Sequence, residues 1–203
     1  MAIKKSVSRY WKEKIIIDAT NMSSLEFLGV RSGWKLATHQ IWPWTGTYPN
    51  SKDAKRTAVK AKLATGTYPL FGNKIHQKSR QSTLCPLCER CDEDLKHFLL
   101  DCPELQKTRQ CEVEEVMRLV DANENRISDR DLIQIIVDCS NSPYLLEVPD
   151  PTLLVQIEWV SRRLVFNLYC RRCYIIRDRG LDSSVKKVST HCQKRAVARK
   201  PTS

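Results

Sequence analysis

Apolar residues recur at helical spacing through most of the chain, and this pattern predicts a mainly α fold. The predicted helices span residues 8–19, 51–65, 104–120, 129–139 and about 151–177. The last is the longest and begins at Pro151. Its apolar side consists of Leu153, Leu154, Ile157, Val160, Leu164, Val165, Leu168 and Tyr169. Three consecutive isoleucines at 15–17 also allow a strand in the first segment, and residues 20–50 look irregular.

Capping and breaking residues set the predicted ends of these helices. Ser51 or Asp53 can cap the helix at 51–65, and Gly66 ends it. Its small apolar side is formed by three alanines and a leucine, at positions 54, 58, 61 and 63. Ser128 caps the helix at 129–139. Periodicity is lost from Gly180 onwards, so we expect a disordered basic tail at 181–203.

A cluster of cysteine and histidine carries the most specific chemistry in the chain. Cys85 and Cys88 are two residues apart, His97 follows after eight more residues, and Cys102 after another four. Three thiolates and one imidazole are a ligand set that structural Zn²⁺ sites use. The first pair lies in a tight turn, and we expect a short helix at 92–102 to carry the second. With four ligands filled, no position remains for water, which indicates a structural and not a hydrolytic site.

Other uses of these residues remain open from the sequence. Small cysteines also pack in cores, and Cys91 competes for a ligand position. A cysteine nucleophile paired with His97 is another reading, although it leaves the remaining ligand-type residues unexplained. Cys170 and Cys173 form a second pair two residues apart, whose partners would have to be His191 and Cys192. The apolar side of the long helix explains this second pair more simply.

The charge is spread unevenly, and the spread separates the chain into three parts. Residues 1–80 hold 15 Lys and Arg against 4 Asp and Glu, whereas residues 81–150 hold 7 against 16. Residues 151–203 hold 12 against 3. Basic segments suit phosphate backbones, because Lys and Arg displace condensed counterions. The alternative is that they form a solvated surface. The candidate nucleic-acid-binding residues are Lys52, Lys55, Arg56, Lys60, Lys62, Lys74, Lys78 and Arg80.

Four segments follow from these features: basic N-terminal helices and linker at 1–80, a zinc module at 81–103, a helical region at 104–180, and the tail at 181–203. We expect no transmembrane helix, because no apolar run approaches 18 residues. Met1 to Lys14 lacks a signal-peptide apolar region, so the nine cysteines point to an intracellular location, nuclear or cytoplasmic. No phosphate-binding loop, zinc-protease or nucleophile-elbow motif is present, and we expect no enzyme.

Three stretches resemble a known family. The stretch 58–70, AVKAKLATGTYPL, is followed by CPLC at 85–88 and HFLLDCP at 97–103. Together they are similar to the C-terminal region of non-LTR (LINE-type) retrotransposon reverse transcriptases, in which a basic helix and turn precede a zinc segment. Residues 135–140 and 157–164 are similar to helices that follow it, so the resemblance covers about 8–177. It implies that Cys85, Cys88, His97 and Cys102 bind zinc, and that the chain binds element RNA or target DNA.

The resemblance does not extend to catalysis, because neither the polymerase motif nor endonuclease acids are present. We therefore expect a zinc-binding, nucleic-acid-binding piece detached from a polymerase core, with RNA or DNA as its partner. The first alternative is a zinc-stabilised protein-interaction module whose apolar stripe at 153–169 docks a partner chain. The second is a fragment of a decayed element that has no function.

Overall fold

The computed structural model describes residues 50–72, 83–120, 127–142, 145 and 151–181, together with residues 10, 13, 14, 17, 26 and 27. This part of the chain is mainly helical, as predicted. Residues 10, 13, 14 and 17 are helical, but most of the expected helix at 8–19 lies outside the described residues. So do the connection at 28–49, the tail beyond 181, and Lys74, Lys78 and Arg80.

The first long helix described, α2 (Ser51–Ala64), begins and ends at polar signals. Its N-cap is Asn50, whose Oδ1 accepts hydrogen bonds from the backbone N–H groups of Lys52 at 3.0 Å and Asp53 at 3.1 Å. The predicted cap, Ser51 or Asp53, is therefore wrong by at least one residue, because Asn50 already satisfies the first free N–H groups. Gly66 follows the helix with a φ of 65°, as its predicted role in ending α2 requires.

The buried side of α2 differs from the predicted alanine side. Ala54 and Ala58 are exposed. The residues that α2 buries are Asp53, Thr57, Lys60, Leu63 and Ala64. The buried lysine has a partner on another helix: Lys60 is 1% exposed and its Nζ forms an ion pair with Oε2 of Glu158. A buried ammonium is tolerated only when it is paired and hydrogen-bonded, so the carboxylate of Glu158 allows this side of α2 to face inward.

The ion pair of Lys60 can be tested by removing its charge while keeping most of its length. We expect Lys60→Met to lower the free energy of unfolding by about 1–3 kcal/mol, because Glu158 is left buried with one partner fewer. The loss is limited because Arg162 Nε still donates to Glu158 Oε1 at 2.7 Å. Lys62→Met, on the exposed side of α2, is the matched control and should stay within about 0.5 kcal/mol. Equal urea midpoints for the two variants would contradict this assignment.

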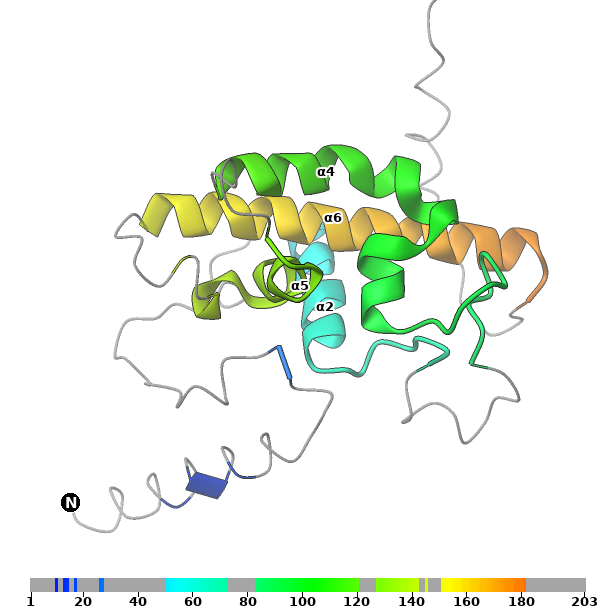
Figure 1. Cartoon of the computed structure of the whole chain (residues 1–203), viewed down its shortest axis with the longest axis horizontal. Coiled ribbons are helices and arrows are strands. Elements are labelled where there is room, and N and C mark those ends of the chain that lie inside the picture. The colour runs from blue at the N-terminus through cyan, green and yellow to red at the C-terminus, as the bar shows by residue number, and fades with distance from the viewer. Residues whose placement is uncertain are drawn as a thin grey trace, which may run out of the picture.

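Three further helices complete the described part of the bundle (Figure 1). They are α4 (Gln106–Leu119), which follows a 3₁₀ turn at Pro103–Leu105; α5 (Asp129–Asp138), which is followed by a 3₁₀ turn at Cys139–Asn141; and α6 (Pro151–Asp178). Ser128 caps α5 as predicted, since its hydroxyl accepts from the N–H of Asp131 at 3.2 Å.

The long helix α6 is the scaffold on which the other elements pack. α4 lies alongside it, and α2 and α5 cross it (Figure 1). Asn167 and Arg163 of α6 bind Glu112 and Glu115 of α4 respectively, so the two helices run antiparallel. One core cluster joins residues of all three predicted segments that the structure describes, from Leu63 and Tyr68 through Phe98 and Val116 to Leu168.

The predicted apolar side of α6 is confirmed as its core side. Ile157, Val160, Leu164, Val165 and Leu168 are buried, and Leu153, Leu154 and Tyr169 are packed against the core. Within the part of the chain that the structure describes, no helix is apolar enough over a sufficient length to span a bilayer.

Candidate metal centre

A short hairpin loop places the first pair of cysteines. Leu84 and Asp92 form an antiparallel bridge at its base, and the N–H of Cys85 donates to the carbonyl of Cys91 at 2.8 Å. Glu89 takes a left-handed conformation with a φ of 56°, and its N–H donates to the carbonyl of Cys85 at 2.8 Å. This tight turn brings Cys88 back towards Cys85, as the spacing of two residues predicted.

The second pair is placed by a π-helix, His97–Asp101, and not by an ordinary α-helix. Asp94 Oδ1 accepts from the N–H of His97 at 2.7 Å, and the N–H of Cys102 donates to the carbonyl of His97 at 2.8 Å. This last bond joins residues five apart, the spacing that defines a π turn. Phe98 and Leu99 of this π-helix are buried.

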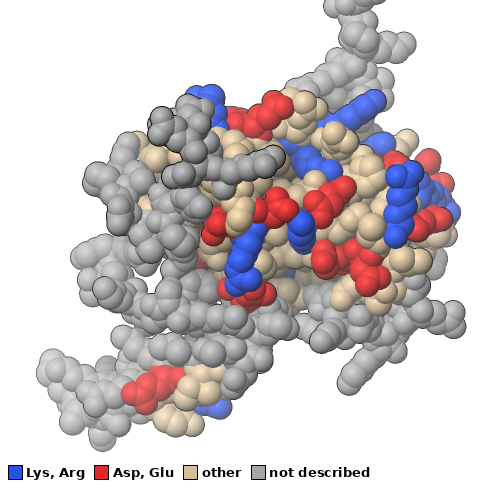
Figure 2. All heavy atoms as spheres, viewed as in Figure 1, with Lys and Arg blue, Asp and Glu red and all other residues tan. Residues whose placement is uncertain are grey.

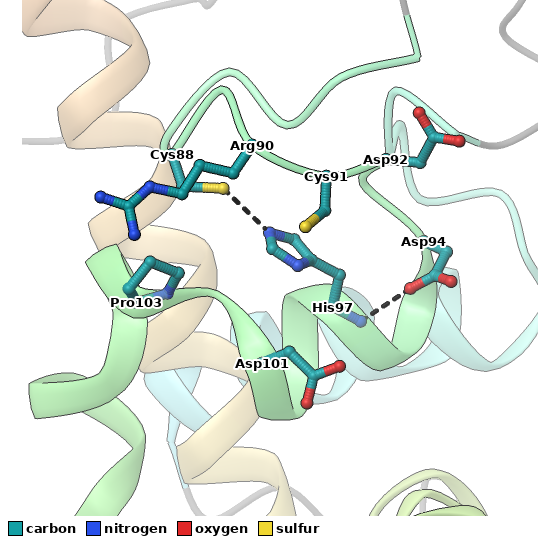
Figure 3. A pocket seen from close by; sticks show the side chains of 8 residues that line it. All are labelled: Cys88, Arg90, Cys91, Asp92, Asp94, His97, Asp101 and Pro103. Atoms are coloured by element: carbon teal, nitrogen blue, oxygen red, sulfur yellow. Dashed lines mark hydrogen bonds between the residues drawn. The ribbon is translucent and has the colours of Figure 1, made fainter.

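The four predicted ligand residues come together in the structure. One ligand atom from each of Cys85, Cys88, His97 and Cys102 lies within 4.8 Å of the others, and this group could hold a metal ion. The Sγ atoms of Cys85 and Cys102 are 3.9 Å apart. Cys88 Sγ is 3.3 Å from His97 Nε2, a contact drawn in Figure 3. Ligand atoms around a tetrahedral zinc are about 3.5–3.8 Å apart, given its usual bond lengths. The separations of 3.9 and 3.3 Å lie near these values, and every separation within the group is at most 4.8 Å.

A hydrogen bond between the Sγ atoms of Cys85 and Cys102 shifts the pKa values of the two thiols in opposite directions. The hydrogen bond between the two sulfurs, with burial, raises the pKa of the Cys85 thiol, and the same bond lowers the pKa of Cys102. Backbone N–H groups of Leu87 and Cys88 oppose the rise at Cys85, and that of Glu104 favours the thiolate of Cys102. These N–H groups point at sulfurs that would carry negative charge as metal ligands.

A buried ion pair fixes the hairpin loop to α6. Arg172 forms two hydrogen bonds with Glu93, Nε to Oε1 at 2.6 Å and Nη2 to Oε2 at 2.8 Å. Both side chains are at most 5% exposed. Glu93 Oε2 also accepts from the N–H of Phe71 at 2.8 Å, and the Arg172 guanidinium lies over the rings of Tyr68 and Phe71. The loop, the turn after α2 and α6 therefore share one hydrogen-bonded network.

Two other arginines hold the backbone beside the ligands. Arg179 Nη1 donates to the carbonyls of Pro86 at 3.0 Å and Leu87 at 2.8 Å, within the cysteine turn. Buried Arg109 of α4 donates from Nη2 to the carbonyl of Cys102 at 2.7 Å. Burial lowers the pKa of Arg109. Arg109 therefore places positive charge beside the candidate centre. Three thiolates with one divalent ion would give that centre a net negative charge. The ligand spacing does not indicate either arginine, because both act on backbone carbonyls and Arg179 is more than 90 residues from the turn that it holds.

One side of the candidate centre opens onto a pocket at the surface (Figure 3). Cys88 and His97 contribute to it, and the exposed Cys91 lies on the same side. Cys91 is not one of the four residues whose ligand atoms converge. Cys170 and Cys173 lie on α6, Cys173 buried, while His191 and Cys192 fall outside the described residues.

The predicted nucleic-acid-binding residues of α2 do not share one environment. Lys55 and Lys62 are exposed, and Lys52 is half-buried. Arg56 is also half-buried and bonds to Asp53 at 3.0 Å, and Lys60 is buried against Glu158, which removes it from any exposed basic surface. On the face shown in Figure 2, Lys and Arg are interspersed with Asp and Glu over the described residues.

Comparison of this chain with protein-family models, with curated proteins and with solved structures finds no match.

Proposed function

We propose that Cys85, Cys88, His97 and Cys102 bind one Zn²⁺ and that this ion has a structural role. The convergence of three sulfurs and one imidazole nitrogen supports it, because this donor set fits Zn²⁺. Zinc bound here would link the hairpin loop to the π-helix. Four protein ligands complete its usual tetrahedral shell, so the ion would stabilise the fold and would not activate water.

We further propose that the zinc-loaded chain binds RNA or DNA through its basic segments. The observation that carries this proposal is the charge distribution: the segments on either side of the acidic middle have large excesses of Lys and Arg. Lys55 and Lys62 of α2 place part of that charge at the surface. The resemblance to the C-terminal region of non-LTR reverse transcriptases is consistent with the same role. Phosphate contacts of this kind give affinity without base specificity.

The salt dependence of binding tests this proposal. We expect zinc-loaded protein to bind mixed-sequence RNA and DNA at low salt, with affinity falling steeply between about 50 and 200 mM salt, because each phosphate contact releases counterions. Lys55→Gln combined with Lys62→Gln should reduce the slope of log affinity against log salt by about 0.7–0.9 for each phosphate that is no longer neutralised. Fluorescence anisotropy measures both quantities. Absence of binding by folded, zinc-loaded protein at low salt would contradict the proposal.

A second candidate, docking of a protein partner, rests on fewer residues than the sequence indicated. The apolar stripe of 153–169 is largely buried within this chain, so it is not a free docking surface. Val155 and Trp159 remain exposed one helical turn apart on α6, at 55% and 38%. Absence of nucleic-acid binding at low salt would favour this candidate.

A further inference from the structure

Two arginines of α6 differ from the other arginines at this helix in having no carboxylate or carbonyl acceptor among the described residues. Arg162, Arg163 and Arg172 each bind a carboxylate, and Arg179 binds the cysteine turn. Arg171 and Arg177, in contrast, are exposed, and neither forms an ion pair with any residue that the structure describes. Their charge is therefore available to an external anion.

The guanidinium groups of these two arginines lie over an exposed aromatic ring. The ring belongs to Tyr174, which is 45% exposed. The guanidinium carbon of Arg171 is 5.5 Å from the centre of its ring, and that of Arg177 is 6.0 Å away. Residues 171, 174 and 177 recur every three positions, so they follow one side of the helix for about 9 Å. We call these three residues the Arg–Tyr–Arg stripe.

We propose that the Arg–Tyr–Arg stripe binds a single-stranded nucleic acid, with a base stacked on Tyr174 and phosphates bound by Arg171 and Arg177. An exposed aromatic ring beside cationic groups is the combination that proteins use for unpaired bases. A base that stacks on Tyr174 would displace a guanidinium from over the ring, and that guanidinium would then contact a phosphate. A duplex exposes phosphates but no unstacked base, so it would contact the two arginines and not the ring of Tyr174. This inference rests on the proposed nucleic-acid binding. Within the basic C-terminal part of the chain, it assigns that binding to three residues and to one strand type.

The surroundings of the stripe favour a polyanion. Residues 171–181 contain four arginines and one acidic residue, the exposed Asp178. The chain then continues into residues 182–203, whose sequence holds six Lys and Arg against one Asp. Arg179 connects the same end of α6 to the cysteine turn, so a strand bound at the stripe would lie on the helix end that the metal centre supports.

The test compares binding of a labelled oligo(dT) strand, an oligo(U) strand and a mixed-sequence duplex by zinc-loaded full-length variants. Tyr174→Ala should weaken single-strand binding by about 5- to 150-fold, the range that stacking of one base on an aromatic ring supplies. Tyr174→Phe should retain it, and duplex binding should change little in either variant. Arg171→Gln should reduce the single-strand salt slope by about 0.7. Circular dichroism confirms that each variant is folded.

Two matched controls separate the stripe from general effects. Trp159→Ala removes another exposed aromatic of α6 that also lies near an arginine, at 6.0 Å from Arg162. Lys107→Gln removes an exposed charge from α4. Both should bind oligo(dT) like the wild type. Wild-type affinity in Tyr174→Ala would overturn the stripe while leaving the proposed function intact, and so would an equal loss for single strand and duplex. Failure of the wild type to bind any of the probes would overturn both.

Discussion

Replacing Cys102 by serine should release the metal and unfold the hairpin loop and π-helix. Cys102 is fully buried and contributes one of the converging sulfurs. Binding of structural zinc contributes on the order of 10 kcal/mol in small zinc domains, before the cost of ordering the chain is subtracted. A hydroxyl is a poor substitute for thiolate as a zinc ligand. Hydrogen exchange should show rapid loss of protection at the amides of Cys85, Glu89 and Glu93, which form the bonds of the hairpin loop.

Two other cysteines provide controls for that substitution. Cys91 is exposed and lies beside the candidate centre but outside the converging group, and Cys111 is exposed on α4. Cys91→Ser and Cys111→Ser should both keep the metal, and their hydrogen-exchange protection should match the wild type. Loss of metal in Cys91→Ser with retention in Cys102→Ser would show that the ligand set is wrong.

Replacing Arg172 by methionine should be the most destabilising change outside the ligands. It leaves Glu93 buried without a charged partner, and removing one member of a buried pair costs about 3–5 kcal/mol. The substitution also removes the hydrogen bond from Arg172 to the carbonyl of Pro69, at 3.1 Å. Urea denaturation of zinc-loaded protein measures the loss as a decrease in the free energy of unfolding.

The neighbouring arginine is the natural control for this prediction. Arg171 is exposed and has no carboxylate partner among the described residues, so Arg171→Met should change the free energy of unfolding by less than about 0.5 kcal/mol. Combining Arg172→Met with Glu93→Gln should recover part of the loss, since an uncharged amide costs less to bury than an unpaired carboxylate. Equal stabilities of Arg171→Met and Arg172→Met would contradict the role of the ion pair.

The features predicted correctly are those that neighbouring residues determine. The apolar side of α6 follows from a repeat within one helix, and the four converging ligand residues follow from spacings of two, eight and four. Gly66 and Ser128 act as helix-end signals because their effects reach only the adjacent turn. In each case the residues that cause the feature lie close together in the sequence, so the sequence alone is enough to predict it.

The features that were missed depend on partners distant in the sequence. Lys60 is buried because Glu158 lies opposite it, 98 residues away along the chain. Arg172 belongs to a helix with an apolar side, yet it binds Glu93 beside the cysteine hairpin, 79 residues away. In both cases the sequence of the helix gives no sign of a counterion for the basic side chain. The carboxylate that pairs with it belongs to another element, which packs against the helix only in the folded chain.

Zinc stoichiometry of the purified, reduced protein, with Cys85→Ser and His97→Ala measured alongside, tests the central claim most directly. Elemental analysis should find one zinc per wild-type chain, and both variants should lose it together with part of their helical structure. A well-folded wild type that contains no zinc after exposure to the ion would contradict the account and leave the four residues as core packing.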